Sequence, residues 1–135
     1  MTTSRWVQVS PEEFLEARNQ STRLGFLTPC EPLDLKEHLL MVSRDRRVGF
    51  AISPQGDLQS VFNNGGPRGA DADAVREAVA LGARTCDIYD GFLRGFYGRF
   101  GFVEVSRVPF DPTLAPATWD YTTYGTPDVV FMRRD

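Results

Sequence analysis

The sequence contains few of the residues that metal and nucleophilic chemistry require. Its only histidine is His38, and its two cysteines, Cys30 and Cys86, lie 56 positions apart and outside any Cys-x-x-Cys pair. These ligands are too few and too scattered for a zinc site, so we expect no metal. A Ser-His-Asp or Cys-His mechanism would depend entirely on His38, which we expect to be a surface or capping residue.

Long apolar stretches are absent as well. No stretch approaches the roughly 18 consecutive apolar residues of a membrane-spanning helix. Residues 1–6 lack the apolar segment of a signal peptide, so we expect a cytoplasmic protein without a membrane partner. In that compartment a disulfide is not expected, and Cys86, which lies in an apolar run, should pack as a small hydrophobic residue.

Lysine is nearly absent from the chain. Lys36 stands beside fourteen arginines, a bias that genomic base composition explains. The net charge is −3 and the isoelectric point is near 5.2, so no overall positive field attracts nucleic acid, which is disfavoured as a partner. Arg68 is the one arginine whose glycine-rich context also suits anion recognition.

The composition provides material for one hydrophobic core. The 135 residues are 41% hydrophobic and include ten Phe, four Tyr and two Trp, which suits a single domain over 1–135. Hydrophobic periodicity and turn residues predict strands at 7–9, 39–43, 48–53, 58–63, 85–89, 102–108 and 128–132. They predict helices at 10–18, 33–37, 72–81 and 92–100, and this mixed order favours an α/β sheet with helices on both faces.

A glycine-rich segment, residues 63–71, separates a predicted strand from a predicted helix. Glycine-rich backbone and the unpaired N–H groups of a helix N-terminus together favour an anion, and Arg68 would add a charged contact. The segment matches neither G-x-G-x-x-G nor G-x-x-x-x-G-K-[ST]. Segments of this kind are commonly simple turns, so taken alone this one is compatible with phosphate binding but does not establish it.

A second motif spans residues 90–102, with the sequence Asp-Gly-Phe-Leu-Arg-Gly-Phe-Tyr-Gly-Arg-Phe-Gly-Phe. It resembles a signature of the GCN5-related N-acetyltransferases, the GNAT superfamily, in which a strand-end Asn precedes Leu-Tyr-x-x-x-Gly-Phe. Tyr97 and the pair Gly101-Phe102 have the spacing of that signature, and Asp90 stands where the family often has Asn. The resemblance covers roughly residues 47–108.

The resemblance implies a fold and a co-substrate. The fold would be α/β, with a mixed, mostly antiparallel central sheet flanked by helices, and the co-substrate would be acetyl-CoA, without a metal. By the family's pattern, the backbone of Val61, Phe62 and Asn63 would pair with the pantetheine arm like an added strand. The pyrophosphate would lie on the following loop, at Gly66, Arg68, Gly69 and Ala70.

The resemblance also implies a mechanism, in which an amine attacks the thioester directly. Tyr97 would belong to the cofactor site and protonate the departing thiolate, since a phenol with a reference pKa of about 10 can donate to sulfur. The alternative for Tyr97 is a packing role at the helix surface. Asp90, at the signature's Asn position, is a further catalytic candidate.

Three positions depart from the family's pattern. Pro67 stands at the first glycine of the phosphate loop and has no N–H to donate. Gln59 stands where some members place a general-base Glu, so Asp57, two residues earlier on the same strand face, is the candidate base acting through water. Gly95 lowers helix propensity and indicates either close approach of the cofactor or tight packing on the sheet.

Residues 109–126 lack a regular period, and a loop of this length in a small domain suggests a function. In proteins of this fold the corresponding connection borders the acceptor site. Its aromatic and acidic residues would suit a cationic amine through cation–π contact and charge; they are Trp119, Asp120, Tyr121 and Tyr124. The alternative is a proline-stiffened loop whose aromatics close one end of the core.

These observations favour an acetyl-CoA-dependent N-acetyltransferase acting on an amine of a small molecule or a protein. One alternative is a GNAT-like fold that binds CoA or a protein partner without catalysis. Another is a transferase acting on a nucleic-acid or nucleotide amine. The sequence leaves the acceptor and a homodimer open.

Overall fold

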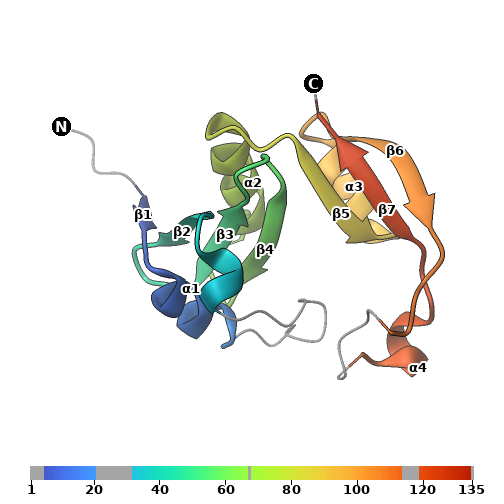
Figure 1. Ribbon diagram of the computed structural model, residues 1–135, viewed down its shortest axis with the longest axis horizontal. Coiled ribbons are helices and arrows are strands. Elements are labelled where there is room, and N and C mark those ends of the chain that lie inside the picture. Colours follow the sequence, from blue (N-terminus) through green and yellow to red (C-terminus); the bar gives the residue numbers. More distant parts are fainter. Residues whose placement is uncertain (1–4, 21–31, 67, 114–118, 135) are drawn as a thin grey trace.

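The computed structural model describes residues 5–20, 32–66, 68–113 and 119–134 (Figure 1). In these ranges the strands form two antiparallel sheets, one of four strands and one of three. None of the helices described is long and apolar enough to cross a membrane.

The first sheet is an antiparallel meander. It consists of β1 (Trp6–Gln8), β2 (Leu39–Ser43), β3 (Val48–Ile52) and β4 (Leu58–Asn63), in that order. Gly56, in the turn between β3 and β4, has a φ of 88°, which glycine adopts without strain, and its N–H donates to Ser53 O at 2.9 Å. The strands expected at 39–43, 48–53 and 58–63 are thereby confirmed to within one residue.

The strand β3 is buried along its whole length because both faces of the first sheet are covered. Val48, Phe50 and Ile52 share a core cluster with α2 (Ala70–Ala80), whereas Ala51 belongs to the cluster of α1 (Pro11–Arg18). Alternate residues of a strand point to opposite faces, so the two helices pack on opposite sides of the sheet. The helix expected at 33–37 is a shorter 3₁₀ turn, η2 (Pro32–Leu35).

The second sheet has the strand order β5 (Thr85–Tyr89), β7 (Val129–Arg133), β6 (Val103–Val108). The helix α3 (Phe92–Gly98) follows β5, and its Tyr97 lies with Cys86, Val130 and Met132 in the same core cluster as α2. The two sheets therefore share one hydrophobic core. A fourth helix, α4 (Tyr121–Tyr124), lies in the segment expected to be loop.

The two sheets meet at the parallel strands β4 and β5 (Figure 1). In the described residues a single bridge links them, between Asp57, which directly precedes β4, and Thr85, the first residue of β5. The α/β class, the antiparallel pairing and the flanking helices are as expected, and the expected central sheet is divided here. A bulge contributes to this division: Ser60 and Val61 together oppose Phe50 on β3, and Ser60 has a φ of 53°. Such a bulge bends the strand and increases its twist.

Candidate functional site

The facing edges of β4 and β5 form the first part of the site. Each strand is hydrogen-bonded on its other side, β4 to β3 and β5 to β7, and in the described residues the two strands pair only at Asp57 and Thr85. Beyond that bridge, backbone N–H and C=O groups of both edges are available to an extended ligand. The edge of β4 includes Val61, Phe62 and Asn63, the residues expected to pair with pantetheine.

Side chains on β4 hold this edge in place. Phe62 is buried against α1, its ring 5.6 Å from that of Phe14, and Val61 packs against the other cluster. The hydroxyl of Ser60 accepts a hydrogen bond of 3.2 Å from Nε of Arg18, a buried arginine at the end of α1. The bulge therefore has a side-chain support from the helix beneath it.

The loop after β4 leads directly into the N-terminus of α2. Gly69 precedes the helix with a φ of 85° and no side-chain cap, so the amides of the first turn have no capping side chain. Within the described part of the chain, a Cβ at Gly69 would meet nothing within 4 Å. This helix end is therefore open to an anion, and the pyrophosphate contact expected of Gly69 and Ala70 stays a prediction.

The N–H group of Gly66, which was expected to help hold the pyrophosphate, already has a partner within the loop. It donates to Asn63 Oδ1 at 2.7 Å. A Cβ at Gly66 would lie 2.6 Å from Val48 Cγ2 and 2.8 Å from Asn63 Oδ1. The structure thus requires glycine here for close packing of the loop on β3 and β4. Pro67, the proposed departure from the family loop, lies outside the described residues.

Charges of both signs surround the loop. Arg68 is exposed, and Arg47 donates to Gly65 O at 3.2 Å. The first turn of α2 carries Asp71, which accepts from Asn63 Nδ2 at 2.6 Å, and Asp73, which pairs with two arginines, Arg5 and Arg76. These partners offset the repulsion that two carboxylates at a helix N-terminus would exert on a phosphate.

Tyr97 is a buried residue of the core. Its side chain is only 7% exposed and contacts the rings of Phe96 and Phe102 at 5.3 and 5.9 Å. Burial, with the neighbouring Cys86 and Asp71, raises the pKa of the phenol above its ordinary value, so the hydroxyl stays protonated. The same rise makes the phenol a weaker acid, so its proton donation to a thiolate stays a prediction.

Gly95, two residues earlier on α3, has open space around it. Among the residues that the structure describes, a Cβ at this position would meet nothing within 4 Å. Of the two explanations that the sequence left open, tight packing on the sheet is therefore wrong. Space for a ligand remains.

Asp57 lies at the junction of the sheets. Its carboxylate accepts from Gln59 Nε2 at 3.0 Å and from Thr85 Oγ1 at 2.8 Å. The negative charge of Asp57 reaches β5, where it contributes, after burial, to raised pKa values of Cys86 and Asp87. This position, where the facing edges of β4 and β5 join, is compatible with a role as general base.

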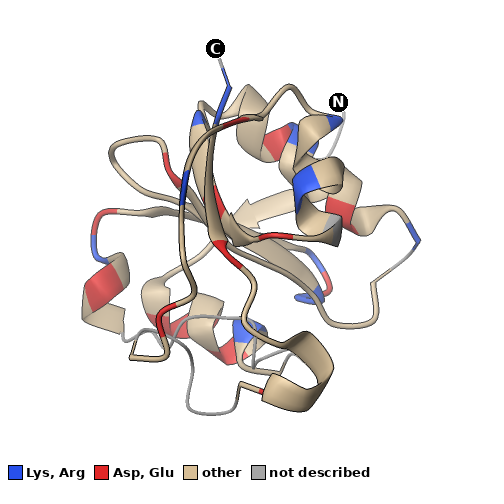
Figure 2. Ribbon diagram, turned by 90° about the vertical axis from the view of Figure 1, so that its right-hand side faces the viewer, with Lys and Arg blue, Asp and Glu red and all other residues tan. Residues whose placement is uncertain are grey.

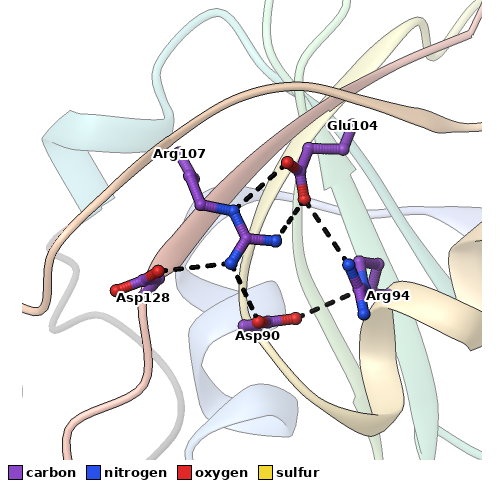
Figure 3. A network of polar contacts seen from close by, with 5 residues as sticks. All are labelled: Asp90, Arg94, Glu104, Arg107 and Asp128. Atoms are coloured by element: carbon purple, nitrogen blue, oxygen red, sulfur yellow. Dashed lines mark hydrogen bonds and ion pairs between the residues drawn. The ribbon is translucent and has the colours of Figure 1, made fainter.

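Asp90 belongs to a network of ion pairs (Figure 3). Its Oδ2 is 3.1 Å from Arg107 Nη1 and its Oδ1 is 3.3 Å from Arg94 Nε. Arg107 also binds Glu104 and Asp128, so the network joins the start of α3 to β6 and to the approach of β7. In this geometry Asp90 fixes α3, the helix that carries Tyr97, on the second sheet.

The expected acceptor residues are brought together at the end of β5. The ring of Trp119 lies 4.5 Å from Tyr89 and 5.3 Å from Tyr124, and Phe110 lies 5.8 Å from Tyr121. Trp119 is buried, whereas Tyr121 and Tyr124 are about half exposed. The cluster both closes the end of the core through Trp119 and presents two tyrosines to solvent.

Asp120 is turned toward its own helix. Its carboxylate accepts from the amides of Thr122 and Thr123 at 3.0 and 3.1 Å, which caps α4. The bond from the Thr123 hydroxyl, followed by these two amide bonds, holds the pKa of Asp120 below its ordinary value. The acidic group near the aromatic cluster that the sequence reasoning missed is Asp87. Burial, followed by the charge of Asp87, raises the pKa of Tyr89. The alternation of β5, with Cys86 and Ile88 inside and Asp87 outside, was the available signal.

Comparison with known proteins identifies the fold. No protein-family model matches the sequence, and no curated protein matches it. Solved structures do match: an acyl-CoA N-acyltransferase from Pseudomonas aeruginosa is 16% identical with a TM-score of 0.65, covering 96% of this chain and 99% of that one. Rv2747 from Mycobacterium tuberculosis, solved in complex with CoA, is 10% identical with a TM-score of 0.61, covering 96% and 98%.

A ribosomal-protein-alanine N-acetyltransferase from Brucella melitensis is similar as well, at 12% identity and a TM-score of 0.57, covering 96% of this chain and 98% of that one. These identities are too low to transfer a substrate, and they show the architecture alone. The chain therefore has the GNAT fold, in a small form that these matches cover almost from end to end.

Proposed function

We propose that the protein is an acetyl-CoA-dependent N-acetyltransferase that passes the acetyl group directly to an amine. The observation that carries this proposal is the pair of facing strand edges, joined at one bridge and leading to the open N-terminus of α2. An extended pantetheine arm suits such edges as an added strand would. The CoA complex of the similar protein from Mycobacterium tuberculosis supports the same ligand class.

The cofactor residues follow from this placement. The backbone of Val61, Phe62 and Asn63 would bind the pantetheine arm, and Gly69 and Ala70 would donate N–H groups to the pyrophosphate. Arg68 would add a charge-assisted contact, while Gly66 shapes the loop.

The proposed reaction needs a base and an acid. Asp57, through water, takes the proton released when an N–H bond of the acceptor's ammonium breaks. The freed nitrogen lone pair attacks the thioester carbonyl, and the C–S bond breaks. Tyr97 donates its hydroxyl proton to the departing thiolate. The new amide nitrogen gives up its second proton, which returns through water to the Tyr97 phenolate, and Asp90 holds the helix that positions Tyr97.

The proposed acceptor is a cationic amine on a small molecule or a protein. Tyr121 and Tyr124 would contact it through their exposed rings, with Trp119 packed behind Tyr124, and Asp87 would supply negative charge. Lys/Arg and Asp/Glu are interspersed along the ribbon in Figure 2, and the net charge is −3. This distribution supports such an acceptor over a nucleic acid. The cytoplasmic location stays a prediction.

A second candidate function is binding of a CoA ester without catalysis. It is favoured by the acidic first turn of α2, by Gln59 and by the engaged amide of Gly66. Acetyl transfer measured against amines, peptides and nucleotides separates the two functions. An enzyme releases CoA only with an acceptor present, whereas a binder is stabilised by acetyl-CoA and releases none.

The Tyr97→Phe variant tests the proposed acid. It removes only the hydroxyl and keeps the ring packing, so acetyl-CoA affinity should stay near wild type while single-turnover transfer falls by about 10²–10⁴-fold. An unchanged single-turnover rate would contradict the role, and a collapsed melting temperature would assign the hydroxyl to structure.

A further inference from the structure

A chain of four side chains crosses from the first sheet to the second. His38, which precedes β2 and is half-buried, places Nε2 at 3.2 Å from Gln59 Oε1. Gln59 Nε2 donates to Asp57 Oδ2 at 3.0 Å, and Thr85 Oγ1 donates to Asp57 Oδ1 at 2.8 Å. His38, expected to be a surface or capping residue, is thus half-buried and hydrogen-bonded to β4. The chain ends at the bridge that joins β4 to β5.

The hydrogen-bond chemistry fixes the direction of this chain. A carboxylate only accepts, so Gln59 must present its NH₂ group to Asp57 and its carbonyl oxygen to His38. His38 must then donate from Nε2, and a neutral ring carries its lone pair on Nδ1. That Nδ1 is buried, and no residue described in the structure bonds to it.

An unpaired buried nitrogen is rare in native proteins and calls for an explanation. The arrangement leaves Nδ1 unsatisfied, yet it holds Gln59 in one orientation and, through it, Asp57. The side chains of Gln59 and Thr85, which come from two different strands, each donate a hydrogen bond to one carboxylate oxygen of Asp57. The structural consequence is one fixed orientation of that carboxylate at the base of the facing edges.

We propose that His38 and Gln59 are positioning residues of acetyl transfer, holding the Asp57 carboxylate in the orientation in which it takes the acceptor's proton. This inference rests on the proposed function. The proton goes from the acceptor's nitrogen to the Asp57 carboxylate, through water, and neither His38 nor Gln59 gains or loses one. Their contribution is geometric, and a misplacement of about 1 Å at a reacting group can cost up to about 100-fold in rate.

The first test is the tautomer of His38. Because the chain has one histidine, the ring ¹⁵N signals of labelled full-length protein belong to His38 alone. At a pH where the ring is neutral, we expect the Nε2–H form in the wild type. In Gln59→Leu the partner is lost, and the Nδ1–H form should become populated. A wild-type ring in the Nδ1–H form would overturn the inference.

The second test compares transfer rates with acetyl-CoA and three probe amines: spermidine, tyramine and a lysine-containing peptide. His38→Leu and Gln59→Leu should each lower kcat by about 10-fold to 100-fold, with the KM for acetyl-CoA unchanged. The double variant should lose no more than either single one, because both act through one chain. His38→Gln keeps an N–H donor and should restore most of the rate. Glu37→Gln, at an exposed neighbour, is the matched control.

The outcomes separate the inference from the proposed function. Equal rates in wild type, His38→Leu and Gln59→Leu would overturn the positioning role while the acetyltransferase assignment stands. A wild type that neither binds acetyl-CoA nor transfers acetyl to the three probes would refute both. Losses that His38→Gln does not restore would assign His38 to packing and contradict the inference.

Discussion

Raising the pH should weaken this protein through one buried thiol. Cys86 is 3% exposed on the inner face of β5, where burial, followed by the charges of Asp57 and Asp87, raises its pKa from 9.0 to about 12. The unfolded chain binds this proton less tightly than the folded one. The contribution of the protonated Cys86 thiol to the free energy of unfolding is therefore complete below pH 9, and it is lost progressively as the pH rises from 9 toward 12.

The size of the effect follows from the two pKa values. At pH 10, one unit above the unfolded value and two below the folded value, the linkage relation gives a loss of about 1.4 kcal/mol from Cys86 relative to pH 7. Urea unfolding at pH 7 and pH 10 measures the total loss. In Cys86→Ala the loss should be smaller by about this amount, since groups common to both proteins cancel.

Asp57→Asn provides a second comparison. Removing the carboxylate charge should lower the pKa of Cys86 and shrink the alkaline loss, although desolvation, the larger cause, remains. Equal losses between pH 7 and pH 10 in wild type and Cys86→Ala would refute the reasoning. They would mean that the thiol is not held in a desolvated position beside the junction of the sheets.

Three further variants test the loop and α3. Gly66→Ala should lower the unfolding free energy by about 1–3 kcal/mol in urea, because its Cβ would lie 2.6 Å from Val48 Cγ2; wild-type stability would contradict the packing of this loop. Gly95→Ala should raise the unfolding free energy by up to about 1 kcal/mol, since the added methyl meets open space among the described residues. The same variant should weaken acetyl-CoA binding in calorimetry, and unchanged affinity would show that no ligand uses the space. Arg68→Ala should weaken acetyl-CoA by about 1.5–3 kcal/mol, and unchanged affinity and salt dependence would place the guanidinium in solvent.

Local patterns were enough to predict most elements of the fold. The meander over 39–63 is marked by turn residues at each end, and the strand at 85–89 has the expected bounds. Helix α2 begins at Ala70 rather than Ala72, because Gly69 in the left-handed conformation starts the helix before its apolar period becomes visible. Helix α4 was missed because four residues around an Asp120 cap are too few for any period.

The site was less accessible to sequence reasoning because it depends on contacts between distant residues. Asp120 was expected to line an acceptor site, but its side chain caps α4. An aspartate directly before a short helix is a common N-cap, and this signal in the sequence could have indicated the cap. His38 and Gln59 lie 21 positions apart and meet only because β2 and β4 flank β3. The division of the sheet likewise depends on a bulge with a positive φ at Ser60. Serine is not a residue type from which a positive φ is predicted.

Amide chemical-shift mapping of the ¹⁵N-labelled protein during titration with acetyl-CoA tests the central claim most directly. Saturable one-to-one binding is predicted, with the largest shifts on the edge of β4, on the facing edge of β5, and at Gly69 and Ala70 before α2. Absence of shifts at millimolar acetyl-CoA, or shifts confined to β1, β2 and β6, would contradict the account.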